Sequence, residues 1–267
     1  MARLDGQVLR RDALALSVVA GMAVLESLMS VSARAETAWE KIERTGVITY
    51  ANGSNYPPME FMQDGKNVGF NIDMGEEIAK RLGKKAEWVI VEFKGIIATL
   101  KSGRVDVINS STTITMSRAK EVTFTRGYVD FGIAAVHGQD VPIKEPADAK
   151  GKVVGVEVGT AGEAWARENL KDAKEVRPYE QLILAMRDLG YGRVDLVVNN
   201  RPALAYTMKM VGAGAKQLEI TPVWDKRVAG LAVRHGEGEL LVKLNEAIDG
   251  MERDGYLAGL RKKWFSE

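Results

Sequence analysis

The stretch GRVDV at residues 103–107 returns, with a single change, as GRVDL at residues 192–196. Each copy follows an amphipathic helical pattern and opens a short apolar run that leads to asparagine. A chance match between five common residues would not explain why the surrounding patterns match as well. We therefore predict two lobes of related topology, one around each copy.

The residues on either side of the two copies alternate short β-like runs with amphipathic helices, which predicts an α/β architecture. Around the first copy we predict strands at 47–50, 86–91 and 105–108 and helices at 71–82 and 93–101. Asn71 is expected to cap the first of these helices and Gly83 to end it. Around the second copy we predict strands at 153–158 and 194–198 and helices at 161–170 and 180–189. Two further helices, broken near residues 254–255, are predicted to cover 237–265.

The position of the expected site follows from this alternation. In open α/β sheets, ligands bind beyond the carboxyl ends of the strands, where helix N-termini point. Residues 109–115 and 199–202 follow predicted strands in the two halves. The sequence therefore predicts a pocket between the two lobes.

Composition excludes several classes of function. The chain has no cysteine, which excludes disulfides, thiolate catalysis, thiolate metal sites and a lipid-modified cysteine anchor. Its two histidines, His137 and His235, are far apart in sequence, so neither a histidine-rich metal site nor any other cofactor is expected. Lysine plus arginine (37) nearly balances aspartate plus glutamate (36), and this balance argues against nucleic-acid binding.

The N-terminus has the pattern of a secretory signal peptide. Basic Arg3, Arg10 and Arg11 precede an apolar run at 13–25, and small residues end in Ala-Arg-Ala at 33–35. The apolar run is shorter than the roughly 20 residues that span a bilayer, and no later segment is long and apolar enough. We predict a signal peptide at residues 1–35 and a soluble periplasmic mature protein. The alternative is a buried N-terminal helix, and Sec or twin-arginine export stays open.

Six motifs, in their order and spacing, carry a family resemblance. They are YPPMEF at 56–61, DGKNVGFNID at 64–73, GRVDVI at 103–108, TITMSRAK at 113–120, KVVGVEVGT at 152–160, and DGY at 254–256 followed by KKWF at 262–265. Together they resemble the amino-acid-binding family of extracytoplasmic solute receptors that serve ABC transporters (family 3 type). The likeness extends over residues 46–265.

The resemblance implies a two-lobed, type II periplasmic-binding-protein fold. Each lobe is expected to hold a central β-sheet flanked by helices, and a two-stranded hinge near 131–136 and 228–233 joins them. Lobe 1 is predicted at 36–132 plus 228–267, and lobe 2 at 133–227. The lobes of such a receptor, expected as a monomer, close on a small carboxylate-bearing, amino-acid-like ligand, and an ABC transporter permease recognises the closed form.

The resemblance also implies ligand contacts in the first lobe. Arg118 matches the arginine that grips the ligand α-carboxylate, to which a guanidinium offers a bidentate fork. Ser111 and Thr113 match positions that hold the carboxylate and ammonium. Tyr56 and Phe93 match the aromatic walls of the pocket. The alternatives are a helix-capping surface arginine, ordinary turn chemistry for the two hydroxyl residues, and a core position for Phe93.

In the second lobe, the match is less complete. Thr160 precedes a predicted helix, so backbone N–H groups there would complete the carboxylate cage; a simple helix cap is the alternative. Ala161 stands where relatives often have a hydroxyl residue. Asn200 stands where they usually have an aspartate that pairs with the ligand ammonium. An amide keeps an acceptor but removes the formal charge.

Two further positions bear on the identity of the ligand. Glu157 matches a position that often meets the ligand, where it would either supply the missing negative charge or select a polar or cationic side chain. A solvated residue at the rim is the alternative. Gly53 stands where receptors for basic amino acids often carry an acid, which argues against lysine or arginine as the ligand.

Two alternatives to a transport receptor stay open. One is an enzyme similar to periplasmic cyclohexadienyl dehydratases, for which Glu157 and Glu163 are the acids expected near the cleft. The other is a binding module without its own permease, such as a sensor subunit or an accessory of a periplasmic oxidoreductase.

Overall fold

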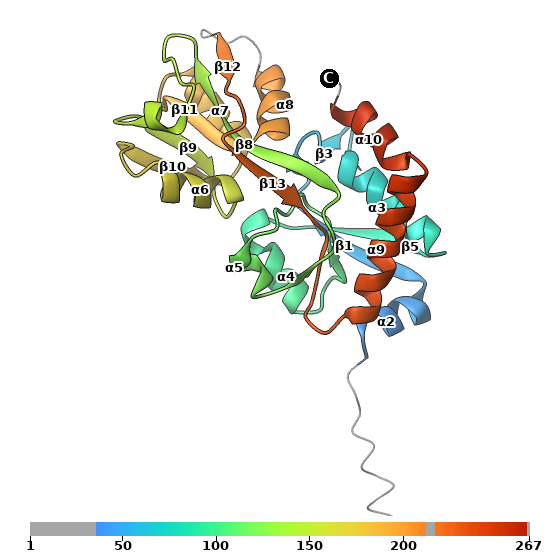
Figure 1. The fold of residues 1–267 in the computed structure, drawn as a ribbon. Helices are drawn as coiled ribbons and strands as arrows, with labels where there is room; N and C mark the ends of the chain where they lie inside the picture. The colour runs from blue at the N-terminus through green and yellow to red at the C-terminus, as the bar shows by residue number, and fades with distance from the viewer. Residues whose placement is uncertain (1–35, 212–216, 266–267) are drawn as a thin grey trace, which may run out of the picture. The chain divides into compact units, whose positions relative to one another are not determined.

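A computed structural model describes residues 36–211 and 217–265 of the chain. The predicted signal peptide at residues 1–35 lies outside these ranges. The named helices and strands all fall within residues 38–265 and are organised on two main β-sheets (Figure 1).

The first sheet has the strand order β5-β1-β6-β14-β7. Its strands are β1 (Val47–Asn52), β5 (Lys85–Ile90), β6 (Val107–Ile108), β7 (Thr123–Phe124) and β14 (Ala232–Val233). The helices of this part of the chain are α2 (Ala38–Thr45), α3 (Phe70–Arg81), η1 (Phe93–Gly95), α4 (Ile96–Lys101), α5 (Met116–Ala119), α9 (Gly238–Arg253) and α10 (Tyr256–Phe265). A small antiparallel sheet is formed by β2 (Asn55–Tyr56), β3 (Glu60–Gln63) and β4 (Lys66–Val68).

The second sheet has the strand order β10-β9-β11-β8-β12, and β13 also pairs with β8. Its strands are β8 (Val129–Gly138), β9 (Val153–Glu157), β10 (Glu175–Tyr179), β11 (Leu196–Asn200), β12 (Leu218–Ile220) and β13 (Asp225–Ala229). The accompanying helices are η2 (Pro146–Ala149), α6 (Ala161–Asn169), α7 (Leu182–Gly190) and α8 (Arg201–Val211).

The two copies of the repeated pentapeptide have the same structural role. The backbone of Asp106 exchanges hydrogen bonds with Thr49 at the start of the β1–β6 pairing, and one carboxylate oxygen accepts the Thr49 N–H at 3.0 Å. In the second sheet, Asp195 accepts the Val153 N–H at 2.7 Å and donates its own N–H to the Val153 carbonyl. In both sheets the next residue begins a parallel strand pair, β6 with β1 and β11 with β9. The repeat therefore reflects related topology, as the sequence predicts.

Strands buried on both faces explain the apolar runs of the sequence. In β11, Leu196 and Val198 join a core cluster with Trp165 of α6, whereas Val197 packs with residues of α7 and α8. In the first sheet, Ile108 likewise packs on the α4 side and its neighbour Val107 on the α3 side. Successive side chains of a strand point to opposite faces, so each sheet is covered by helices on both sides.

The chain passes from one sheet to the other twice, between β7 and β8 and between β13 and β14 (Figure 1). The long strand β8 contains the predicted hinge segment 131–136. The second predicted segment, 228–233, is split into the end of β13 and β14. The lobe boundaries at 132/133 and 227/228 stay predictions.

Several predicted boundaries need correction. Asn71 does not cap α3: the N-cap is Gly69, at φ +136, where a Cβ would lie 2.3 Å from the Met59 carbonyl oxygen. The predicted helix at 93–101 divides into η1 and α4, and the helix at 180–189 is α7 at Leu182–Gly190. The strand predicted at 105–108 is shortened to Val107–Ile108, and the strand predicted at 194–198 is Leu196–Asn200.

The second pair of strand boundaries moved because the Asp residues of both repeats use their side chains to bind backbone N–H groups of the neighbouring strand. The sequence did not predict the small sheet β2–β4, the strands β7, β10 and β12, or the helices α2, α5 and α8. Within the part of the chain that the structure describes, no helix combines the length and hydropathy needed to cross a membrane.

Replacing Asp106 with Ala should lower the free energy of unfolding by about 2–4 kcal/mol, because it removes charge-assisted bonds and leaves a buried N–H unpaired. Asp106 is fully buried and accepts bonds from Thr49 and Lys41. Urea denaturation of the protein measures this loss. Glu121→Ala, which removes only an exposed ion pair with Lys101, is the control and should cost less than about 1 kcal/mol. Equal midpoints for both variants would contradict the assigned role.

Candidate functional site

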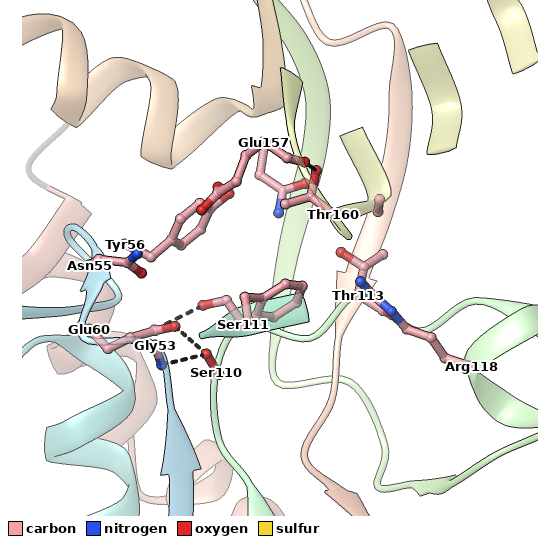
Figure 2. Close-up of a pocket in the computed structure, with 13 residues that line it drawn as sticks. Gly53, Asn55, Tyr56, Glu60, Ser110, Ser111, Thr113, Arg118, Glu157 and Thr160 are labelled. Atoms are coloured by element: carbon pink, nitrogen blue, oxygen red, sulfur yellow. Dashed lines mark hydrogen bonds between the residues drawn. The ribbon is translucent and has the colours of Figure 1, made fainter. Parts of the chain in front are cut away.

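A cavity lies at the carboxyl ends of the parallel strands of both sheets (Figure 2). Thirteen residues line it: Gly53, Asn55, Tyr56, Glu60, Phe93, Ser110, Ser111, Thr113, Arg118, Glu157, Thr160, Ala161 and Asn200. All nine predicted ligand contacts are among them. The structure therefore brings the predicted residues together in one place, and their contact with a ligand stays a prediction.

Arg118 lies in the short helix α5, which Thr115 caps by accepting the Arg118 N–H. Its guanidinium donates to the Thr113 carbonyl at 2.8 Å and to the Gly159 carbonyl at 2.9 Å, so it joins segments that follow β6 and β9. It also lies over the Phe93 ring, 5.4 Å from the centroid. Desolvation lowers the pKa of Arg118 to about 10, so the group stays cationic at neutral pH.

The loop after β9 brings a helix N-terminus to the cavity. Thr160 caps α6 by accepting the Glu163 N–H at 3.1 Å, and its hydroxyl donates to the Glu157 carbonyl at 2.7 Å. The capping alternative is therefore correct for Thr160, and the residue lines the cavity as well. Glu163 does not line the cavity. It accepts the Gly159 N–H and binds Arg167, which stabilises the first turn of the helix.

Tyr56 and Asn199 connect the two sides of the cavity. The Tyr56 hydroxyl donates to the Asn199 amide oxygen at 2.8 Å, and the Asn199 amide nitrogen donates to Glu157 at 3.2 Å. Figure 2 shows the Tyr56 ring extending toward Glu157. Glu157 is only 3% exposed, so the alternative of a solvated rim residue is wrong. The neighbouring Asn200 is buried too, and its amide oxygen has no hydrogen-bond donor within the described structure.

Glu60 is a cavity residue that the sequence did not predict. It is 1% exposed and accepts hydrogen bonds from Ser110 at 2.7 Å, Asn71 at 2.6 Å and Ser111 at 3.3 Å. Asn71 in turn accepts the Tyr128 hydroxyl at 3.0 Å. A glutamate within YPPMEF does not differ in pattern from an exposed strand residue. Asn55 and Ser110 also went unpredicted, although they follow predicted strands, where lining residues are expected.

This buried network fixes a strained turn after β6. Ser111 has φ +46, in the left-handed region that non-glycine residues rarely occupy. The Ser111 hydroxyl both accepts from Asn71 and donates to Glu60, and the Ser110 hydroxyl donates to Glu60 and accepts the Gly53 N–H. The surrounding bonds therefore hold a conformation that costs about 1–3 kcal/mol. Such strain is typical of sites where backbone groups are presented to a ligand.

Both buried acids have raised pKa values. Burial raises the pKa of Glu60 to about 8, with its hydrogen bonds opposing the shift. Burial also raises the pKa of Glu157 to about 7, with the Asn199 bond opposing the shift and the Glu92 charge adding to it. The negative charge of either acid therefore depends on what else occupies the cavity.

Comparisons with known proteins agree with this architecture. The sequence profile of the family described as bacterial extracellular solute-binding proteins, family 3, matches residues 48–267. The chain is 34% identical over 269 residues to the L-cystine-binding protein TcyJ of Escherichia coli, covering 99% of this chain and 97% of that protein.

Two solved structures are also similar. An ancestral arginine-binding protein bound to arginine superposes with a TM-score of 0.77 at 38% identity, covering 82% of this chain and 98% of that one. The ancestral amino acid-binding protein AncCDT-1, a precursor of cyclohexadienyl dehydratase, gives a TM-score of 0.79 at 32% identity, covering 85% and 98%.

The two sheets, the double crossing between them and the cavity at their strand ends define a type II periplasmic-binding-protein fold with a two-stranded hinge, as the resemblance implied. The chain belongs to the bacterial extracellular solute-binding proteins, family 3.

Replacing Glu60 with Gln should flatten the dependence of stability on pH. The folded pKa of about 8 lies above the unfolded value of 4.5, so between these pH values the folded state holds a proton that the unfolded state has lost. Stability therefore falls as pH rises through this window, by up to about 1.4 kcal/mol per pH unit for one group. Urea denaturation at pH 5.5, 6.5 and 7.5 should show a shallower slope for Glu60→Gln than for wild type. Parallel slopes, with exposed Glu121→Gln as reference, would contradict the raised pKa.

Proposed function

We propose that this protein is an extracytoplasmic receptor that captures a small amino acid, or a closely related carboxylate, and delivers it to an ABC transporter permease. The observation that carries the proposal is the guanidinium of Arg118. It lies in the cavity, donates only to the Thr113 and Gly159 carbonyls, and has no carboxylate partner in the described parts of the chain. A half-buried cation without a counter-ion favours an anionic ligand group.

The cavity offers further donors for a carboxylate on the same side. The hydroxyls and backbone of Ser111 and Thr113 lie beside Arg118, and α6 begins at Ala161 directly across from them. A helix N-terminus favours negative charge because its first N–H groups have no partners within the helix. These groups support the predicted carboxylate cage. The absence of a hydroxyl at Ala161 leaves the backbone as the donor there.

The names of the relatives support an amino-acid ligand. TcyJ is named for L-cystine and the ancestral protein for arginine, and both contain an α-carboxylate and an α-ammonium. The expectation that Gly53 disfavours lysine or arginine concerns the ligand side chain and stays a prediction. We propose that the protein carries an N-terminal signal peptide at residues 1–35, acts in the periplasm as a monomer, and lacks enzymatic activity.

A second candidate, an enzyme resembling cyclohexadienyl dehydratase, is favoured by one observation. Glu157 is a buried acid in the cavity with a pKa near 7, which suits a general acid. The ancestral neighbour named as a precursor of that enzyme is itself named an amino acid-binding protein. Incubation of the purified protein with prephenate or arogenate decides between the two: any turnover abolished by Glu157→Gln would establish the enzyme.

Replacing Arg118 with Ala should weaken binding of an amino-acid ligand by about 100-fold or more, because it removes a charge-assisted, bidentate partner. A thermal-shift screen over the proteinogenic amino acids and L-cystine identifies the ligand, since binding to the native state raises the melting temperature. The Arg118→Ala variant should show no shift with that ligand. Arg104→Ala, which removes an exposed arginine outside the cavity, is the matched control and should keep the shift. An undiminished shift in Arg118→Ala would remove this residue from the site.

Ligand binding should also make the molecule more compact. We propose lobes at 36–132 plus 228–267 and at 133–227 that close on the ligand, since cavity residues come from both segments. Closure is favoured only by the difference in ligand affinity between closed and open forms. Small-angle X-ray scattering should give a smaller radius of gyration with saturating ligand than without it. An unchanged radius in the presence of a tightly bound ligand would contradict closure.

A further inference from the structure

The cavity contains opposite charges that do not neutralise each other. Arg118 binds two backbone carbonyls, and the only side chain that donates to Glu157 in the described structure is the Asn199 amide. Neither group takes part in an ion pair within the described ranges. A buried cation and a buried acid that share a cavity but stay unpaired each leave unfavourable desolvation uncompensated. A ligand with separated charges of both signs would compensate both.

The wall around Glu157 is rich in acceptors and poor in donors. The Asn200 amide oxygen is buried and accepts no hydrogen bond, and the Asn199 amide oxygen is already occupied by the Tyr56 hydroxyl and the Asn200 N–H. Asn199 also holds the Glu157 carboxylate in place. Two acceptors, one of them ionisable, therefore face the cavity at adjacent strand ends of β9 and β11.

The second acid of the cavity is differently bound. The oxygens of Glu60 accept from Ser110, Asn71 and Ser111, so its hydrogen-bonding capacity is largely satisfied by the protein. Glu157, with a single side-chain donor, retains free acceptor positions. Of the two carboxyl groups, Glu157 is thus the one able to bind a new donor.

We propose that Glu157 and Asn200 form the subsite for a cationic nitrogen of the ligand, with Glu157 supplying the negative charge. This inference rests on the proposed function and narrows its ligand class to molecules that carry both a carboxylate and a cationic amine. Keto acids, hydroxy acids and dicarboxylates lack the nitrogen and would leave the Asn200 oxygen without a donor.

The charged and titratable groups around Glu157 determine its response to pH. The surrounding groups are Tyr56 of β2, Glu60 of β3, Glu92 before η1, Arg118 of α5, Tyr179 opposite in β10, Glu163 and Arg167 of α6, and Arg187 and Asp188 of α7. Glu163 pairs with Arg167 and Asp188 binds Tyr179 and Arg193, so these groups are mutually satisfied. Arg187 is exposed.

A cationic nitrogen at this subsite stabilises the ionised carboxylate, so it lowers the pKa of Glu157 in the complex. In the free protein burial raises that pKa to about 7. Binding at pH 6.5 should therefore release a proton. Affinity should rise with pH up to about 7 and then level off.

The test uses isothermal titration calorimetry with whichever of L-arginine, L-cystine and the other proteinogenic amino acids the wild-type protein binds most tightly. Titrations at pH 6.5 in buffers of different ionisation enthalpy count the protons released. Wild type should release about 0.8 proton, the protonated fraction of a group with a pKa of about 7. Glu157→Gln should bind about 10- to 100-fold more weakly and lose this release.

A rescue variant separates a charge effect from a structural one. The double variant Glu157→Gln with Asn200→Asp moves the negative charge to the adjacent strand end and should recover affinity to within about tenfold of wild type. Glu92→Gln removes an exposed acid close enough to affect Glu157 but outside the cavity lining, and it should change affinity less than about twofold.

Three results would overturn the proposal. Unchanged affinity and proton release in Glu157→Gln would show that the amino acid binds without this subsite, while leaving the proposed function intact. Proton release that persists in Glu157→Gln but disappears in Glu60→Gln would place the cation at Glu60. A wild-type protein that binds none of the amino acids would reject both the proposed function and the subsite.

Discussion

The parallel pairing of β1 with β6 and of β9 with β11 is the constraint on which the site depends. Parallel strands bring their carboxyl ends to the same edge of a sheet, so residues far apart in sequence meet there. Asp106 and Asp195 fasten the start of each pairing through the same backbone contacts. Of the lining residues, only Glu60 in β3 and Arg118 in α5 do not lie at or soon after the end of such a strand. Two buried aspartates, at the opposite ends of the strands from the cavity, thus determine where the cavity forms.

The polar interior of the cavity has a stability cost that its hydrogen bonds only partly offset. Burial raises the pKa values of Glu60 and Glu157 and lowers that of Arg118, so each group is less easily charged than in water. Ser111 adds backbone strain. Unpaired charge and strain in one place are expected where a protein retains a site for binding and not for stability. The network around Glu60 keeps these groups in position before any ligand arrives, which reduces the entropy lost on binding.

Local pattern predicts part of this structure and long-range contact determines the rest. Apolar spacing places α3 within one residue of its observed bounds, because Ile78 and the other core residues of that helix face one side. The role of Asn71 was wrong because its partners, Glu60 and Ser111, are 11 and 40 residues away. No local signal shows that contact. The nine predicted lining residues came from a family resemblance, which contains the tertiary information that spacing lacks. Glu60 lacked both signals, so neither its burial nor its raised pKa could be predicted.

The separation of charge within the cavity also accounts for selectivity. Arg118 and the N-terminus of α6 form one end, and Glu157 with the free oxygen of Asn200 forms the other. A ligand that satisfies only one end leaves the other desolvated and unpaired on closure, at a cost of about 1–3 kcal/mol or more for a charged group. Selectivity for zwitterions then arises mainly from this penalty against incomplete ligands, since a site built from polar groups rejects an analogue that cannot pair with them. Because cavity residues at the two ends belong to both sheets, the same pairing that selects the ligand would also favour the closed form.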